Sequence, residues 1–151
     1  MNGAQRKTET SLKLTRSFSV PRERLFEAWT NPVELKNWWK LGHGWRLSVA
    51  EVDLRVGGRY RIGLASSQSE AKHAVTGTFR EVSVPERLVY TWIVEDQRTN
   101  YEESIVTVEF HDKGNSTELV LKHDKLLSTE SRQNTYDGWL TVLGGLARLL
   151  G

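Results

Sequence analysis

Apolar and polar residues alternate over residues 11–20, and a period of two is the pattern of a half-buried β-strand. The period then changes to that of a helix, because residues 21–30 begin with a proline and carry one apolar stripe. Pro32 ends this segment and starts a second short helical one, which stops before Gly42. The pattern therefore predicts a strand followed by two short helices.

From Trp45 onward the period of two returns, interrupted by short clusters of glycine, proline, serine, asparagine and aspartate. Such short connections favour antiparallel neighbours, because parallel strands need long crossover segments. With the first strand, these segments predict a seven-stranded antiparallel sheet. The six later strands are expected at 45–54, 58–65, 72–82, 87–95, 103–112 and 116–123.

Residues 131–150 return to helical spacing and predict a long C-terminal helix, capped by one of three polar residues, Ser128, Thr129 or Ser131. The expected buried stripe comprises Tyr136, Trp139, Leu140, Leu143, Ala147 and Leu150. Glycine weakens a helix, so we interpret the three glycines of this segment as points of close approach to the sheet. They are Gly138, Gly144 and Gly145.

An amphipathic helix must bury one stripe and an antiparallel sheet one face. The economical α+β arrangement therefore curls the sheet around the C-terminal helix, while the two short helices between the first two strands close one end. A curved sheet and a straight helix diverge, and the gap between them predicts a pocket. We expect residues 1–10 to be a flexible N-terminal segment and residues 11–151 to form a single domain.

The amino-acid composition excludes several classes of functional site and partner for this protein. The chain has no cysteine, which excludes disulfides, thiolate metal sites and cysteine nucleophiles. Its net charge is only +2, and basic and acidic stretches alternate, so we expect no nucleic-acid partner. No apolar leader and no run of 18 apolar residues is present, so we expect a cytoplasmic protein that does not insert into membranes.

Histidines give little sign of a metal centre. His43, His73, His111 and His123 are scattered without the spacing of a zinc site, so we predict no metal. There is also no phosphate-binding loop, and we predict no cofactor. His123 ends an alternating strand face. Its imidazole either points toward the pocket or bonds to a backbone carbonyl near the edge of the core.

One group of charged residues could in principle do acid–base chemistry. Glu51, Asp53 and Arg55 are expected on one face of a strand, and paired carboxylates can act as acid and base. The neighbouring arginine favours an ion-paired structural cluster instead. We assign no catalytic residue. Alternation leaves open which face of this strand turns inward.

Aromatic residues are the strongest positive signal. Four of the six tryptophans lie in the first third of the chain, and further rings alternate along the predicted strands. Ligand pockets are typically apolar and aromatic-lined, with a few polar groups. The expected cavity residues are Trp29, Trp38, Trp39, Tyr60, Phe79, Tyr90, Trp92, Phe110, His123, Tyr136 and Trp139.

Several stretches resemble the family named for the C-terminal domain of the activator of heat shock protein 90 ATPase. This family belongs to the START-like, birch-pollen-allergen-like superfamily, and the resemblance implies its helix-grip fold. The stretches span most of the chain: LFEAWTNPVELKNWW (25–39), EVDLRVGGRYRI (51–62), GTFREVSVPERLVYTW (77–92), TVEF (107–110), TELVLKH (117–123) and DGWLTVLGGLARLL (137–150).

Three functions follow as hypotheses. The leading one is binding of a small hydrophobic or aromatic molecule, to sequester or sense it, between sheet and helix. The second is a pocket enzyme of the cyclase or hydrolase kind, with His123 or Glu51 as acid–base group. The third, which the resemblance implies, is interaction with a chaperone. The oligomeric state stays open, a homodimer included.

Overall fold

The structure, a computed structural model, describes residues 10–40, 44–70, 72–95, 103–126 and 128–150. Over this part of the chain, antiparallel strands form one seven-stranded sheet in the order β1-β7-β6-β5-β4-β3-β2. The strands are β1 (Thr10–Phe18), β2 (Trp45–Val52), β3 (Arg59–Ser66), β4 (Lys72–Ser83), β5 (Arg87–Val94), β6 (Ser104–Asp112) and β7 (Thr117–Leu126). The helices are α1 (Arg22–Thr30), α2 (Pro32–Trp38) and α3 (Thr129–Leu150).

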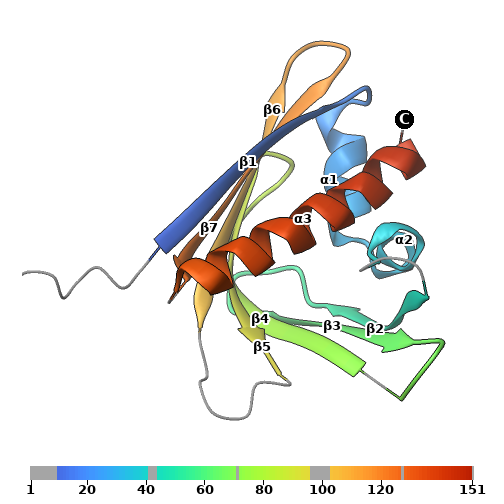
Figure 1. The fold of residues 1–151 in the computed structure, drawn as a ribbon. Helices are drawn as coiled ribbons and strands as arrows, with labels where there is room; N and C mark the ends of the chain where they lie inside the picture. The colour runs from blue at the N-terminus through green and yellow to red at the C-terminus, as the bar shows by residue number, and fades with distance from the viewer. Residues whose placement is uncertain (1–9, 41–43, 71, 96–102, 127, 151) are drawn as a thin grey trace, which may run out of the picture.

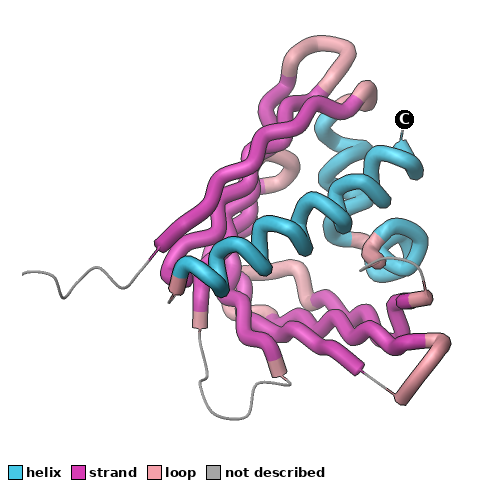
Figure 2. The backbone as a smooth tube through the Cα atoms, in the orientation of Figure 1, coloured by secondary structure: helices cyan, strands magenta, loops and turns pink. Residues whose placement is uncertain are grey.

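The predicted α+β arrangement is confirmed. Figure 1 shows α3 running along the inner side of the bent sheet, with α1 and α2 beside its C-terminal half. Figure 2 shows β2 and β3 turning away from the direction of β1 and β7, so that the sheet wraps around the helix. Within the described residues, no helix combines the length and the apolar character that crossing a membrane requires.

A β-bulge in β2 answers the question that alternation left open. The register with β3 shifts by one residue between Leu47 and Val49, which leaves Ser48 as an extra residue. Because side chains alternate between faces, one extra residue exchanges the two faces of the strand. Leu47 before the bulge is buried, and Ala50 and Val52 after it also pack against the core.

Helix α3 begins with the predicted serine cap, because the Ser131 N–H donates to the Ser128 Oγ at 2.9 Å. Its buried residues are Trp139, Val142, Leu143 and Leu146. The predicted stripe was wrong at Leu140, which is 44% exposed. The buried stripe is displaced around the helix from the predicted one, because it includes Val142 and Leu146 and leaves Leu140 outside.

The three glycines of α3 serve different purposes. A Cβ at Gly145 would lie 2.3 Å from the Trp38 carbonyl oxygen, so α3 approaches α2 closely at this point. At Gly138 a Cβ would meet no atom within 4 Å, and at Gly144 it would meet only the Arg148 Nη1 at 3.8 Å. The interpretation of all three as close approaches to the sheet was therefore wrong, because the one close approach is to another helix.

Candidate functional site

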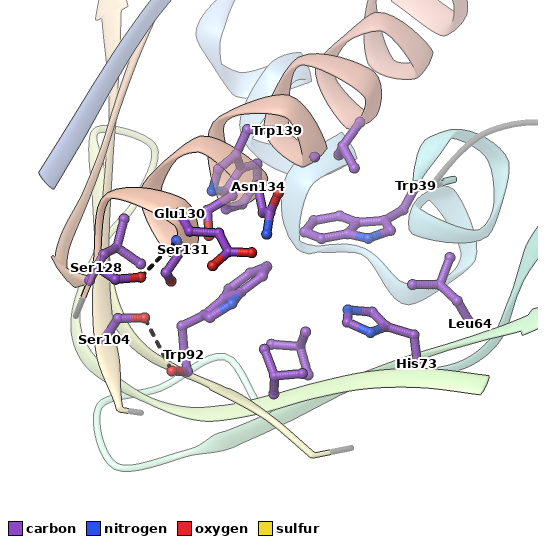
Figure 3. A pocket seen from close by; sticks show the side chains of 16 residues that line it. Trp39, Leu64, His73, Trp92, Ser104, Ser128, Glu130, Ser131, Asn134 and Trp139 are labelled. Carbon is purple, nitrogen blue, oxygen red and sulfur yellow. Dashed lines mark hydrogen bonds between the residues drawn. The ribbon is translucent and has the colours of Figure 1, made fainter. Parts of the chain in front are cut away.

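A cavity of about 500 Å³ lies between the sheet and the N-terminal half of α3 (Figure 3). This volume falls within the range of small-molecule sites, about 300–1,000 Å³. Strands β3 to β7 form one side of the cavity, and α3 and the end of α2 form the other. Its apolar lining includes Trp39, Leu64, Val75, Trp92, Trp139 and Val142.

Three indole rings form a continuous part of this lining. The Trp92 and Trp139 ring centroids are 5.1 Å apart, those of Trp39 and Trp139 5.6 Å, and those of Trp39 and Trp92 6.2 Å. Behind them, Trp29 stacks on Trp139 with an interplanar angle of 13°. Rings held on several sides by other rings keep their orientation, so this part of the cavity is rigid.

The deeper tryptophans fix the short helices. Trp38 is fully buried and donates its indole N–H to the Ala28 carbonyl oxygen at 2.8 Å, which ties α2 to α1. Its ring also lies against Trp29 and Trp39, at centroid distances of 5.3 and 5.4 Å. Trp38 therefore supports the indoles that line the cavity, although it does not line the cavity itself.

Polar residues gather on the helix side of the cavity. Glu130, Ser131 and Asn134 come from the first turns of α3, and Ser128 precedes them. Figure 3 shows His73 on the opposite side, where β4 contributes its ring. Within the part of the chain that the structure describes, the cavity lining includes no lysine, arginine or aspartate, and Glu130 is its only carboxylate.

His123 lies behind this lining in a chain of hydrogen bonds. The Trp139 Nε1–H donates to the His123 Nδ1 at 3.0 Å, and the His123 Nε2 lies 2.7 Å from the Ser104 Oγ. Because an indole N–H can only donate, Nδ1 must be the acceptor and Nε2 carries the proton. The Ser104 hydroxyl then donates to the Trp92 carbonyl oxygen at 3.3 Å. The chain thus connects two of the indole residues that line the cavity.

The environment of His123 favours a neutral imidazole. Burial lowers the pKa of His123 to about 3, because the charged form is poorly solvated there. A second proton on Nδ1 would also point at the Trp139 N–H, which offers no acceptor. His123 thus holds Trp139 and Ser104 in place as a neutral side chain. Its partners are side chains and not the backbone carbonyl that the sequence suggested.

A smaller cavity of about 30 Å³ lies deeper, between the sheet and the two short helices. This is room for about one water molecule. Two tyrosines on its wall have assigned partners: the Tyr60 hydroxyl donates to the Thr91 carbonyl oxygen at 2.6 Å, and the Tyr90 hydroxyl accepts from the Trp29 Nε1–H at 3.3 Å. Burial raises the pKa of both hydroxyls, so they stay protonated.

The structure distributes the eleven predicted cavity residues over three positions. Three of them line the large cavity: Trp39, Trp92 and Trp139. Two of these three, Trp39 and Trp92, also line the small cavity. Four more of the predicted residues line the small cavity alone: Trp29, Tyr60, Phe79 and Tyr90. The remaining four line neither one: Trp38, Phe110, His123 and Tyr136.

The charged residues that could have done acid–base chemistry do not meet at the cavity. Strand β2 ends at Val52, so Asp53 and Arg55 lie in the following loop and not on a strand face as predicted. They form an exposed ion pair at 2.9 Å. Glu51 is exposed on β2 and does not line either cavity.

The remaining histidines are separated from one another. His111 pairs with Glu109 at 3.0 Å on the surface, and His73 lines the large cavity. His43 lies outside the described residues. In the part of the chain that the structure describes, no three histidine or carboxylate side chains are grouped so that they could hold a metal ion.

Sequence reasoning missed several polar residues at the cavity. Ser104 continues the alternation of the inward-facing residues of β6, and a polar residue at such a position was the available signal. Glu130, Asn134 and Gly138 follow one another at intervals of four, which places them on one helix face. These positions do not belong to the apolar stripe from which the buried face of the helix was predicted.

Comparisons with known proteins show what this arrangement is similar to. Residues 19–151 match the family model described as activator of Hsp90 ATPase homolog 1-like protein. A solved structure of a protein from Chromobacterium violaceum is 29% identical, with a TM-score of 0.83, covering 93% of this chain and 96% of that one. The AHSA1 protein from Silicibacter pomeroyi is 26% identical, with a TM-score of 0.80 and coverages of 93% and 97%.

An HSP90 activator from Plasmodium falciparum is 30% identical to this chain, with a TM-score of 0.69 and coverages of 93% and 96%. The comparison with curated protein sequences gave no match. The family model covers most of the chain, and the similar structures repeat the sheet and its long C-terminal helix. The protein therefore belongs to the family of activator of Hsp90 ATPase homolog 1-like proteins, with their START-like helix-grip fold.

Proposed function

We propose that the protein binds a small apolar or aromatic molecule in the large cavity, and that it holds or senses this molecule without transforming it. The observation that carries the proposal is the cavity of about 500 Å³ with its wall of three indoles and its polar residues on one side. His123 and Glu51, the two residues that the sequence suggested as acid–base groups, do not line it.

Gly138 supports the same proposal. It lies within α3 and lines the cavity, and a Cβ there would meet no atom within 4 Å. Glycine within a helix costs roughly 0.5–1 kcal/mol relative to alanine. Since packing of the protein does not require the glycine, the space it leaves is consistent with room for a bound molecule.

Binding of N-phenyl-1-naphthylamine, a neutral aromatic dye that fluoresces in apolar surroundings, tests the proposal. The wild-type protein should bind the dye saturably. Gly138→Leu, which places a side chain in the cavity, should weaken binding at least tenfold. Gly144→Leu, on the same helix but outside the cavity lining, should bind like the wild type. Equal dye affinity in Gly138→Leu and wild type, with helix content preserved in both, would refute the proposal.

A second candidate function is stimulation of a chaperone ATPase. The observation that favours it is the 30% identity, over 93% of this chain, to the HSP90 activator from Plasmodium falciparum. The cavity plays no necessary part in this function, so the two candidates can be tested separately.

The ATPase rate of the host's heat shock protein 90, measured with increasing amounts of the protein, tests the second candidate. A saturable rise in the rate would support it, and Gly138→Leu should stimulate as well as the wild type. An unchanged rate at a large excess of the protein would exclude it.

A further inference from the structure

We infer that the large cavity selects aromatic or apolar molecules that carry a positive charge, such as organic amines, over those that carry a carboxylate. This inference rests on the proposed function, because it names the class of molecule that the same cavity would take. It is carried by the charge of the described lining residues and by the indole rings among them.

The charge of the lining is one-sided. Among the described residues of the lining, Glu130 is the only carboxylate, and these residues include no lysine or arginine. Figure 3 shows the Glu130 carboxylate and the Asn134 amide directed toward the space in front of Trp92. A ligand ammonium group placed there would have a carboxylate partner, whereas a ligand carboxylate would meet a like charge.

The indoles act in the same direction. A cation over the face of a tryptophan is attracted by the negative face of the ring, and tryptophan is the best of the aromatic side chains for this interaction. Trp39, Trp92 and Trp139 lie within 6.2 Å of one another, centroid to centroid, in the same lining as Glu130. The same rings also bury the apolar part of a ligand.

The helix dipole of α3 opposes the preference for a positively charged ligand, but its effect is weaker than that of the carboxylate. The N-terminus of α3 carries a partial positive charge of about half an elementary charge, and it lies near Glu130. The full negative charge of the carboxylate exceeds it. The nearest basic residue along α3, Arg132, is directed elsewhere, because its Nε–H donates to the Ser11 carbonyl oxygen at 2.7 Å. Arg132 and Lys125 are both absent from the lining.

Three ligands with the same ring and different charges test the inference: tryptamine (positive), 3-methylindole (neutral) and indole-3-acetate (negative), titrated calorimetrically at pH 7. Tryptamine should bind most tightly and indole-3-acetate most weakly. Glu130→Gln should reduce tryptamine affinity about three- to fivefold, as expected for an ion pair with the exposed Glu130 side chain, and leave the affinity for 3-methylindole unchanged. Asp137→Asn removes an exposed carboxylate of α3 outside the lining and should leave all three affinities unchanged.

The outcomes separate this inference from the proposed function. Equal affinities for the three ligands, or a preference for indole-3-acetate, would overturn the inference while binding of the neutral ring still supported the proposed function. An unchanged tryptamine affinity in Glu130→Gln would also overturn it. Failure of the protein to bind 3-methylindole and the neutral dye would overturn the proposed function itself.

Discussion

At the scale of single residues, His123 shows how a buried polar group can hold an apolar site in shape. Both ring nitrogens have hydrogen-bond partners, Ser104 and Trp139, and both of these residues line the cavity. A buried polar group without partners would cost about 1–3 kcal/mol, so the strand and helix positions of Ser104 and Trp139 are coupled through the imidazole. The indole at the centre of the wall is thus oriented by a hydrogen bond as well as by packing.

Stability should depend on pH through this histidine. Its pKa is about 3 in the folded protein, below the ordinary value of 6.5, so the stability from the neutral imidazole is complete above pH 6.5. That stability falls as the pH drops toward 3, because the unfolded chain takes up a proton that the folded chain refuses. The slope is about 1.4 kcal/mol per pH unit.

Urea unfolding at pH 7.0 and pH 5.0 measures this effect. Between these values the wild type should lose about 2 kcal/mol more free energy of unfolding than His123→Gln, whose amide does not titrate. Other groups that titrate in this range contribute equally to both proteins. Parallel pH dependence of the two proteins would contradict a buried neutral imidazole.

At the scale of elements, the glycines of α3 differ in what lies next to them. Near its C-terminus, Gly145 lets the helix backbone approach the Trp38 carbonyl oxygen. Nearer its N-terminus, Gly138 faces open space and the cavity. The close contact of α3 with α2 therefore lies near the C-terminus of α3, and the cavity lies along its N-terminal half.

Alanine substitutions at the three glycines of α3 should have opposite effects. Gly145→Ala places a Cβ 2.3 Å from a backbone oxygen, so the free energy of unfolding should fall by about 1–3 kcal/mol. Gly138→Ala and Gly144→Ala meet no such atom and should raise it by about 0.5–1 kcal/mol. Chemical unfolding of the three variants gives these values. A stabilising Gly145→Ala would show that the two helices are not in close contact there.

At the scale of the whole molecule, the sheet curves around α3, and a cavity separates part of the sheet from the helix. Interiors of proteins are usually close-packed, so an unfilled volume of about 500 Å³ leaves apolar side chains without partners on one side. A ligand that enters this volume contacts both the sheet and α3. Its binding energy therefore stabilises the folded state as a whole.

Ligand binding should accordingly raise the melting temperature. N-phenyl-1-naphthylamine at 100 times its dissociation constant should add about 2.7 kcal/mol of stability. For a chain of this length, that corresponds to a rise of roughly 5–10 °C, measured by scanning calorimetry. Gly138→Leu at the same dye concentration should show no such rise. An equal rise in this variant would place the dye outside the cavity.

The order of the elements and the alternation along most strands follow from the sequence, because local periodicity determines them. The sequence also limited the cap of α3 to three candidate residues, and it left the direction of the His123 side chain open. The tertiary structure alone decided the bulge at Ser48 and the helix partner of Gly145. It also decided which tryptophans line the cavity and which support it. Alternation shows which side chains of a strand share a face, but it does not show how far away the opposite layer lies. That distance depends on the curvature of the whole sheet and on where α3 diverges from it.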